Sequence, residues 1–213
     1  MNKGFFITFE GGEGAGKSIQ VEILTSHLHE EGYPLTVTRE PGGTRIGEQI
    51  RVITHDPENV DLNSIAEAYL MSAARAQHVV EIIKPALDAG KIVVCDRFVD
   101  SSIAYQGYGR KLGPEIIAKL NELAVDGATP DLTLFLNVPP EVGMKRRGKA
   151  QKKDRLDLQQ ADFYRRVHDG YIELAKEHPS RFIIIDASKT IEKVAVGIWD
   201  VVKQALNSVG YSR

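Results

Sequence analysis

FFITFEGGEGAGKS, residues 5–18, joins a short apolar run to a glycine-rich loop and the start of a helix. The apolar run holds three phenylalanines and an isoleucine, which favour a strand, and it stops at Gly11. From Gly11 onward the residues follow the pattern Gly-x-x-x-x-Gly-Lys-Ser, which is typical of a phosphate-binding loop. A strand before this pattern and a helix after it form the context that the loop requires. We therefore expect this loop to bind a nucleoside triphosphate.

Each residue type in the loop has a physical task. The glycines permit backbone angles that are closed to other residues, so that successive N–H groups can face one phosphate. The positive N-terminal end of the following helix adds to this attraction. Lys17 brings a mobile cation to the phosphates, and Ser18 brings a hydroxyl for a phosphate-bound Mg²⁺. The predicted ATP-binding residues are Gly11, Gly12, Glu13, Gly14, Ala15, Gly16, Lys17 and Ser18, of which Lys17 is also catalytic.

The composition limits the class of protein. The chain has 213 residues, which suits one domain or one domain with a lid, and 42% of them are hydrophobic. Lys plus Arg total 27 against 29 Asp plus Glu, and this net charge of -2 argues against a protein that coats nucleic acid. The single Cys95 excludes an internal disulfide framework and fits a reducing compartment. No apolar run is long enough for a membrane helix or a signal peptide. We expect a cytoplasmic protein that binds neither nucleic acid nor membrane.

Beyond the loop, apolar segments of strand type alternate with segments of helical periodicity. Strands are expected at 5–9, 35–38, 91–95, 132–138 and 181–186. Helices are expected at 19–31, 44–53, 63–89 with a bend near Pro85, 101–107, 113–125, from Pro139 into a basic run, 159–177 and 190–206. This alternation predicts an α/β protein of one domain, residues 1–213. Its parallel five-stranded sheet has right-handed crossovers and helices on both faces.

Two polar residues directly follow the strand at 91–95. In open parallel sheets, ligands bind beyond the carboxyl ends of the strands. Asp96 after four apolar residues has the form of a Walker B acid, so we expect it to hold Mg²⁺ together with Ser18. An ordinary polar residue at the end of a strand is the alternative for Asp96. Arg97 beside the phosphate loop matches phosphate bidentately, and we expect it to be catalytic.

A basic run at residues 145–155 lies between two helices. Its basic residues are Lys145, Arg146, Arg147, Lys149, Lys152, Lys153 and Arg155. Charge runs are usually solvated surfaces, and that alternative stays open. In a small phosphate-loop protein, a run at this place also suits a short mobile lid that closes over the phosphates. We take 145–157 as the lid, with Arg155 held by its neighbour Asp154. The predicted catalytic cations of the lid are Arg147, Lys149 and Lys152.

Two classes of phosphate-loop protein fit these motifs. One is a small kinase that moves phosphate from ATP to a small acceptor, and the other is a nucleotide switch of the GTPase kind. A guanine-reading switch needs an Asn-Lys-x-Asp stretch after a late strand, but the only Asn-Lys pair is at residues 2–3, ahead of the first strand. No Cys/His or His-Glu pattern suggests zinc. The sequence therefore favours a kinase.

Longer motifs resemble the bacterial thymidylate kinase family over nearly the whole chain. They are FEGGEGAGKS (9–18), TREPGGT (38–44), SAARAQH (72–78), CDRFVDSSIAYQGYGR (95–110) and DRLD (154–157). Asp-Arg followed by Ser-Ser-x-x-Tyr-Gln is far more specific than the phosphate loop alone. The resemblance implies a cytoplasmic homodimer that converts ATP and dTMP into ADP and dTDP with Mg²⁺.

The same resemblance assigns residues to the acceptor. It implies that Arg97 grips the acceptor phosphate and that Glu13, also catalytic, approaches the deoxyribose. Because positions 12–15 carry no arginine, the chain resembles the type of thymidylate kinase whose lid supplies the basic groups. The full set of implied substrate-binding residues is Glu13, Arg39, Glu40, Arg51, Met71, Arg75, Arg97, Ser102, Tyr105 and Gln106.

Two positions depart from the family's pattern. Ile19 stands where the family usually has Thr, so a hydroxyl contact on the α-phosphate side is missing. Met71 stands where an aromatic residue commonly stacks on the thymine ring. Methionine can still pack against a ring through its polarizable sulfur. We expect both departures to change affinity for donor or acceptor while the reaction stays the same.

Overall fold

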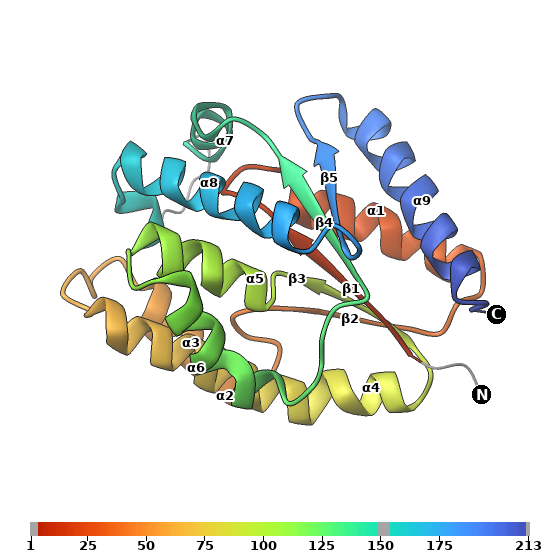
Figure 1. The fold of residues 1–213 in the computed structure, drawn as a ribbon, viewed down its shortest axis with the longest axis horizontal. Helices are drawn as coiled ribbons and strands as arrows, with labels where there is room; N and C mark the ends of the chain where they lie inside the picture. The colour runs from red at the N-terminus through yellow and green to blue at the C-terminus, as the bar shows by residue number, and fades with distance from the viewer. Residues whose placement is uncertain (1–3, 149–153, 212–213) are drawn as a thin grey trace.

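The protein is built around one parallel sheet, which Figure 1 shows in a computed structural model that describes residues 4–148 and 154–211. The sheet has five strands in the order β2-β3-β1-β4-β5. They are β1 (Phe5–Glu10), β2 (Leu35–Arg39), β3 (Ile92–Asp96), β4 (Leu132–Asn137) and β5 (Phe182–Asp186). The predicted α/β fold with a parallel five-stranded sheet is confirmed, and the strands begin and end close to the expected residues.

The register of the three neighbouring strands brings their polar ends together. Phe9 of β1 and Arg39 of β2 both lie opposite Asp96 at the end of β3. Every residue of β1 is buried, Thr8 and Glu10 included, which explains why its apolar residues do not alternate with exposed polar ones. The phosphate loop, Arg39 and Asp96 therefore leave the sheet at the same edge.

Twelve helical segments are described. They are α1 (Lys17–Glu30), α2 (Arg45–His55), α3 (Ser64–His78), η1 (Val79–Ile83), α4 (Lys84–Asp88), α5 (Val99–Ser102), η2 (Ile103–Gly109), α6 (Pro114–Val125), α7 (Pro140–Arg147), η3 (Leu156–Leu158), α8 (Ala161–Glu177) and α9 (Ile191–Ser208). Side chains cap the starts of two of the expected helices. The Thr44 hydroxyl accepts from the N–H of Gly47 (3.0 Å), and the Asn63 side chain accepts from the N–H of Ile65 (2.8 Å).

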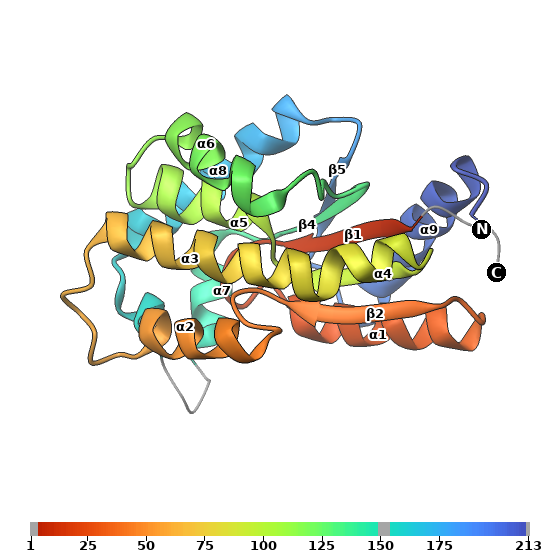
Figure 2. The same ribbon diagram turned by 90° about the horizontal axis from the view of Figure 1, so that it is seen from below.

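Two of the expected helices contain π-helical turns. The helix expected at 63–89 is divided into α3, η1 and α4, which lie in one line in Figure 2. Its π turn, η1, directly precedes Lys84-Pro85, where proline cannot donate a backbone hydrogen bond. The short helix expected at 101–107 is instead the end of α5 followed by η2. Such turns are frequent at functional sites, and η2 carries two of the predicted acceptor residues.

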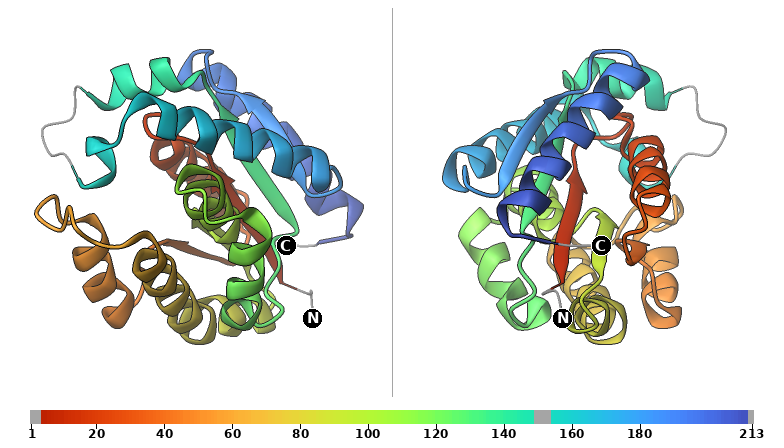
Figure 3. Two further views of the ribbon diagram at one scale, coloured as in Figure 1. Left: turned by 60° about the vertical axis from the view of Figure 1, so that its left-hand side comes forward. Right: turned by 90° about the vertical axis from the view of Figure 1, so that its right-hand side faces the viewer.

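Helices cover both faces of the sheet, as predicted and as Figure 3 shows. Ile7 and Phe9 pack with α1 and α9 on one face. Phe6 and Cys95 pack with η1 and α4 on the other face, where Phe135 joins α8. Successive residues of a strand point to opposite faces, so each strand contributes to both layers of the core. Cys95 is fully buried and free, as expected for a small core residue.

Candidate active site

A cleft of about 650 Å³ opens at the carboxyl ends of β1, β2 and β3. Its volume is in the range of small-molecule sites. The lining includes every residue predicted to bind the acceptor, together with Lys17, Ser18, Asp96 and Arg147. The lining also holds Arg146 of the predicted basic run, together with residues to which the sequence analysis gave no individual role, namely Pro41, His55, Phe98, Ser101 and Leu156. A second hollow of about 490 Å³ lies on the other side of the loop, toward the start of α9.

The phosphate loop has most of the predicted backbone geometry. Gly11, Gly14 and Gly16 adopt positive φ angles of 141°, 69° and 92°. Gly12 does not have a positive φ angle, so its backbone conformation does not require glycine at this position. Lys17 is buried, and its Nζ donates to the carbonyl oxygens of Gly11 and Gly12 at 3.0 Å each. Burial and the charge of Arg97 lower the pKa of Lys17 to about 8. Lys17 thus lies folded onto its own loop.

Helix α7 packs directly on this loop through two glycines. A Cβ atom on Gly14 would overlap the carbonyl oxygen of Gly143, and a Cβ on Gly143 would overlap that of Glu13. The close approach explains how two side chains at the end of α7, Arg146 and Arg147, reach the cleft. Nothing in the sequence pattern indicated a role for Gly143, because its partner lies far away in the chain.

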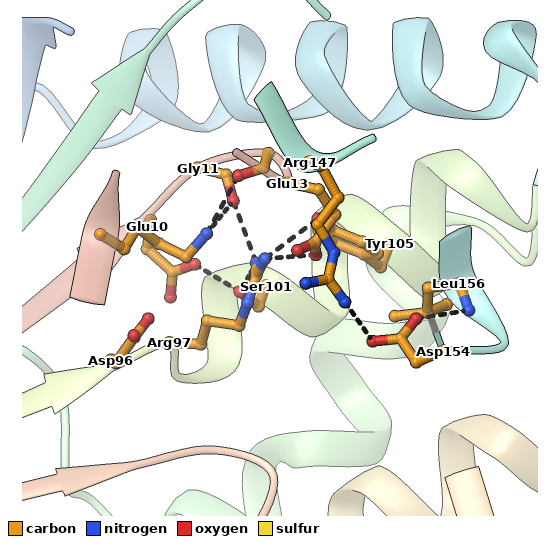
Figure 4. Close-up of polar contacts among 12 residues, drawn as sticks. Glu10, Gly11, Glu13, Asp96, Arg97, Ser101, Tyr105, Arg147, Asp154 and Leu156 are labelled. Carbon is orange, nitrogen blue, oxygen red and sulfur yellow. Dashed lines mark hydrogen bonds and ion pairs between the residues drawn. The ribbon is translucent and has the colours of Figure 1, made fainter. Parts of the chain in front are cut away.

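Arg97 lies at the centre of the site, between the phosphate loop and the acceptor residues (Figure 4). Its φ of 72° is in the left-handed region, which is uncommon outside glycine and concentrates at functional sites. The Arg97 guanidinium donates to the carbonyl oxygen of Gly11 (3.0 Å), to Glu13 (2.6 Å) and to the Tyr105 hydroxyl (3.2 Å). Burial alone would raise the pKa of Glu13, but Arg97 and Lys17 outweigh it and lower that pKa to about 2.

A fully buried carboxylate, Glu10, is linked to Arg97 through two hydroxyl groups. It accepts hydrogen bonds from the N–H of Phe98 (2.8 Å) and the hydroxyls of Ser101 (2.5 Å) and Tyr171 (2.9 Å). Those two hydroxyls also lie 3.2 and 3.3 Å from Nη1 of Arg97. Burial and the nearby charge of Asp100 raise the pKa of Glu10 to about 7. Sequence reasoning missed Glu10, which reads as the last residue of a strand.

Ser18 and Asp96, the two residues predicted to hold Mg²⁺, lie within hydrogen-bond distance of each other. The Ser18 hydroxyl donates to Oδ2 of Asp96 at 3.0 Å. Oδ1 of Asp96 is buried and has no hydrogen-bond partner within residues 4–148 and 154–211. A hydroxyl and an unsatisfied carboxylate oxygen beside a phosphate loop fit Mg²⁺, which proteins usually hold through one or two carboxylates plus substrate phosphates. Elsewhere in the described chain, no group of three or more His, Cys, Asp or Glu side chains could hold a metal.

On the acceptor side, Glu40 holds Arg75. The buried Glu40 carboxylate accepts from Nε of Arg75 and from Nδ1 of His78, both at 2.9 Å. Arg75 also donates to Ser102 (3.0 Å) and to Asn121. The prediction placed Glu40 at the nucleotide, and it does line the cleft, but its carboxylate oxygens are bonded to these two neighbours. Glu40, His78 and Asn121 form a frame around Arg75 that the sequence did not reveal.

The other predicted acceptor residues reach the cleft from several elements. Arg39 is half exposed and pairs with Glu48 (2.8 Å), whereas Arg51 donates to the carbonyl oxygen of Pro41 (3.0 Å). Met71 is partly buried on α3. The Gln106 side chain is buried in η2 and donates to Glu67 (2.7 Å). Only two pairs of the predicted acceptor residues are adjacent in sequence, Arg39 with Glu40 and Tyr105 with Gln106, so the fold brings the others together.

The basic run is arranged differently from the expectation. Arg147 lines the cleft, and Asp157 binds it through two hydrogen bonds of 2.9 Å. The expected pairing of Arg155 with Asp154 is wrong, because the Arg155 side chain turns into the protein and pairs with the buried Glu67. Asp154 instead lies 3.5 Å from Arg147. Lys149 and Lys152, predicted as catalytic, lie outside the described residues.

Residues 9–198 match the family model described as thymidylate kinase. A thymidylate kinase of Geotalea uraniireducens is 51% identical over 201 residues, which cover 92% of this chain and 94% of the relative. A thymidylate kinase of Pediococcus pentosaceus is 47% identical over 207 residues, with coverage of 96% and 99%. The crystal structure of thymidylate kinase from Ehrlichia chaffeensis superposes with a TM-score of 0.77 at 36% identity, over 94% of this chain and 98% of that one.

Proposed function

Because the chain belongs to the thymidylate kinase family, whose members phosphorylate dTMP to dTDP with ATP, we propose how its cleft performs that transfer. The observation that carries the proposal is the position of Arg97. Its guanidinium contacts the phosphate loop at Gly11 and the acceptor residues Glu13 and Tyr105. An arginine in this place can bind the acceptor phosphate in line with the donor.

The donor binds along the phosphate loop. Loop N–H groups and the N-terminal end of α1 hold the phosphates, and Lys17 leaves its carbonyl partners to bind them. A bound phosphate would raise the pKa of Lys17, which burial and Arg97 lower to about 8, and so would favour the charged form. The second hollow, between the loop and the start of α9, takes the nucleoside of ATP. Ile19 lines both hollows and offers no hydroxyl there.

The acceptor binds on the opposite side of Arg97. Arg75, Ser102 and Gln106 converge on the inner wall, where polar side chains can recognise the edge of a base. Oε1 of Gln106 is buried and has no hydrogen-bond partner in the described part of the chain, so it can accept from a base N–H. Tyr105 and Glu13 lie beneath the place of the sugar. Met71 closes the pocket from α3.

The transfer needs alignment of the two phosphates and neutralisation of their charge more than a covalent intermediate with the protein. Ser18 and Asp96 would hold Mg²⁺, which neutralises phosphate charge when bound. Arg97 orients the attacking phosphate oxygen, and Arg147 meets the charge that develops between donor and acceptor. No strong general base is required, because the attacking oxygen belongs to a phosphate that is ionised near neutral pH. In this proposal the chain forms one domain, and its residues 145–157 form the lid.

We also propose a homodimer in a reducing, cytoplasmic compartment. Apolar side chains are exposed on the adjoining helices α3 and α6, among them Tyr69 (61%), Ile116 (65%) and Leu123 (89%). A second copy of the chain would cover them. The sole cysteine is buried and free, which suits reducing conditions. Within the described ranges, no helix has the length and apolarity needed to cross a bilayer.

A comparison of acceptors tests the site assignment. We expect dTMP to be the preferred acceptor when ADP release is measured with dTMP, dUMP, dCMP and dGMP at equal concentrations. The expectation follows from the polar inner wall formed by Arg75, Ser102 and Gln106. Equal or better use of dCMP or dGMP would contradict the assigned base site, although the assignment of the phosphate loop would stand.

A further inference from the structure

Glu67, in the first turn of α3, is a fully buried carboxylate that touches none of the reacting groups. Three side chains from two other parts of the chain bind it. Gln106 donates to its Oε1 (2.7 Å), whereas Arg110 (3.1 Å) and Arg155 bind its Oε2. Burial would raise the pKa of Glu67, but the charge of Arg110 and the hydrogen bond from Arg155 outweigh it and lower that pKa. Glu67 is thus a buried, charged carboxylate that connects side chains from two other parts of the chain.

One contact of Glu67, with Gln106, connects it to the acceptor side of the cleft. Gln106 lies in η2 and lines the cleft, and within the described residues its side-chain amide has one hydrogen-bond partner, Oε1 of Glu67. The hydrogen bond fixes which end of the amide is the donor, because a carboxylate can only accept. The free Oε1 of Gln106 is thereby set as the acceptor end. Glu67 therefore determines how Gln106 is oriented.

Another contact of Glu67, with Arg155, connects it to the turn at residues 154–157. Arg155 donates from Nε to the carbonyl oxygen of Thr54 (2.9 Å), and its backbone N–H donates to that of His55 (3.0 Å). The Arg155 guanidinium is therefore held between Glu67 and the end of α2. Its side chain is only 4% exposed, so Glu67 supplies the charge that an arginine buried so deeply requires.

The turn that Arg155 anchors holds Arg147. Asp154 and Asp157 close this turn on each other's backbone, with N–H···O distances of 2.8 and 3.1 Å. Both oxygens of Asp157 then bind the Arg147 guanidinium at 2.9 Å. An unbroken series of contacts thus runs from Gln106 through Glu67, Arg155 and the turn to Arg147.

We propose that Glu67 is a positioning residue, which sets the place of Arg147 through Arg155 and ties it to the acceptor side through Gln106. The proposal rests on the function assigned above to Arg147. Removing the charge of Glu67 leaves Arg155 buried without a counter-charge, so the anchor of the turn is lost. Arg147 then samples other positions, and a displacement of about 1 Å can cost roughly a hundredfold in rate.

A double-mutant cycle on the full-length enzyme tests this series of contacts. The four proteins are the parent, Arg147→Ala, Arg155→Lys and the double variant, and kcat and both KM values are measured with ATP and dTMP. Lysine keeps the charge near Glu67 but cannot contact Glu67 and Thr54 together. We expect Arg155→Lys to lower kcat about tenfold or more, with the KM for ATP nearly unchanged. In the Arg147→Ala background, it should lower kcat no further.

The same cycle with Glu67→Gln examines the contacts of Glu67 with Gln106 and Arg155. It should reproduce the loss of kcat and in addition raise the KM for dTMP, because an amide can both donate and accept and no longer fixes the orientation of Gln106. If Glu67→Gln does not fold, the cycle with Arg155→Lys still decides the proposal. Equal losses of kcat in both backgrounds would overturn the proposal and leave the role of Arg147 intact. A parent-like kcat for Arg147→Ala would overturn the role of Arg147 and the proposal with it.

A matched control separates positioning from general damage to the core. Asp100 is another fully buried carboxylate, bonded through both oxygens to Arg181 (2.7 and 2.8 Å) and not part of the series. Asp100→Asn should lower the melting temperature. Any effect of Asp100→Asn on kcat should be the same with and without Arg147. A dependence on Arg147 equal to that of Glu67→Gln would contradict the proposed path.

Discussion

The phosphate loop and the acceptor wall of the same cleft are held in place by different means. The loop consists of consecutive residues, 11–18, whose shape comes from backbone angles and from the helix they begin. The acceptor wall, the side of the cleft that carries Arg75, Ser102 and Gln106, depends on buried contacts between distant segments, such as the ion pair of Glu40 with Arg75. A change in the loop should therefore act on chemistry, whereas a change in the wall should act on stability and affinity together.

The largest effect is expected in the loop, for Lys17→Ala. Within residues 4–148 and 154–211, the hydrogen bonds of Lys17 Nζ go to carbonyl oxygens of its own loop, so its loss removes a phosphate contact and no long-range support. We expect kcat/KM to fall about 10³-fold, at the upper end for one charge-stabilising donor, with little change in melting temperature. The measurement is steady-state kinetics with thermal unfolding.

Lys176→Ala is the control, because this lysine is exposed and pairs only with Glu173 one turn away. It should change neither quantity. Parent-like turnover of dTMP by Lys17→Ala would show that the loop does not bind the donor. A large loss of stability in that variant would instead contradict the view that changes in the loop act on chemistry and not on stability.

The next effect concerns two glutamates whose pKa values move in opposite directions. The pKa of Glu10 is raised to about 7 by burial and by Asp100, so the folded state keeps a proton that the unfolded state loses above about pH 4.5. The contribution of Glu10 to stability is therefore fully present below that pH and is lost as the pH rises toward 7, by up to about 3 kcal/mol. Glu10→Gln should remove this slope between pH 5 and 8 in urea unfolding.

Glu13→Gln serves as the control for Glu10→Gln. The pKa of Glu13 is lowered to about 2, because Arg97 and Lys17 outweigh burial. Its contribution is present above pH 4.5 and is lost as the pH falls toward 2. Glu13→Gln should thus leave the slope between pH 5 and 8 in place. An unchanged slope in Glu10→Gln would assign the pH dependence to other groups.

In the acceptor wall, Glu40→Gln should weaken stability and dTMP binding at once. The amide can still accept from one neighbour, but Arg75 and His78 lose the shared charge between them. We expect a loss of about 1.5–3 kcal/mol in the free energy of unfolding, the scale of a hydrogen bond to a charged group. The KM for dTMP should rise, while the KM for ATP stays within about twofold of the parent.

Glu48→Gln is the matched control, because Glu48 forms the same kind of pair with Arg39 at the surface. An exposed pair is worth at most about 1 kcal/mol, so the change in the free energy of unfolding should be small. Equal losses in the two variants would contradict the view that the buried pair supports the wall.

The sequence predicted what is encoded locally. The phosphate loop and the proximity of Ser18 to Asp96 follow from motifs that occupy consecutive positions or the ends of strands. The fold class follows from the same alternation of segments. The residues quoted from the family resemblance also reach the cleft together, since they belong to motifs that the sequence displays.

The supports of the site could not be predicted, because they depend on long-range packing. Glu10, Glu67 and His78 look like ordinary polar residues of a strand and a helix, and only the fold shows that they are buried between charged partners. Arg155 misled the prediction for the same reason. Its neighbour in sequence is Asp154, but a carboxylate 88 positions away holds it.

The smallest effect is expected for Met71→Phe, which tests the wall without touching an ion pair. Met71 is partly buried on α3 and lines the cleft, where the family resemblance implies a ring stacked on thymine. Phenylalanine is of similar size, so the change exchanges a flexible thioether for a flat ring. We expect dTMP to bind more tightly by about 0.5–1 kcal/mol, or roughly two- to fivefold, the scale of a contact between aromatic rings.

Isothermal titration with dTMP measures this gain, and titration with ATP is the control, because the donor side has no contact with α3 in the proposed arrangement. A gain of equal size for ATP would indicate a general change in the cleft. A crystal structure of the dTMP complex with Met71 far from the base would refute the assigned position, whatever the affinity. Because neither residue carries charge or donates a hydrogen bond, the unfolding free energy should stay nearly constant. Met71→Phe would then separate affinity from stability on a wall where every ion-pair variant changes both.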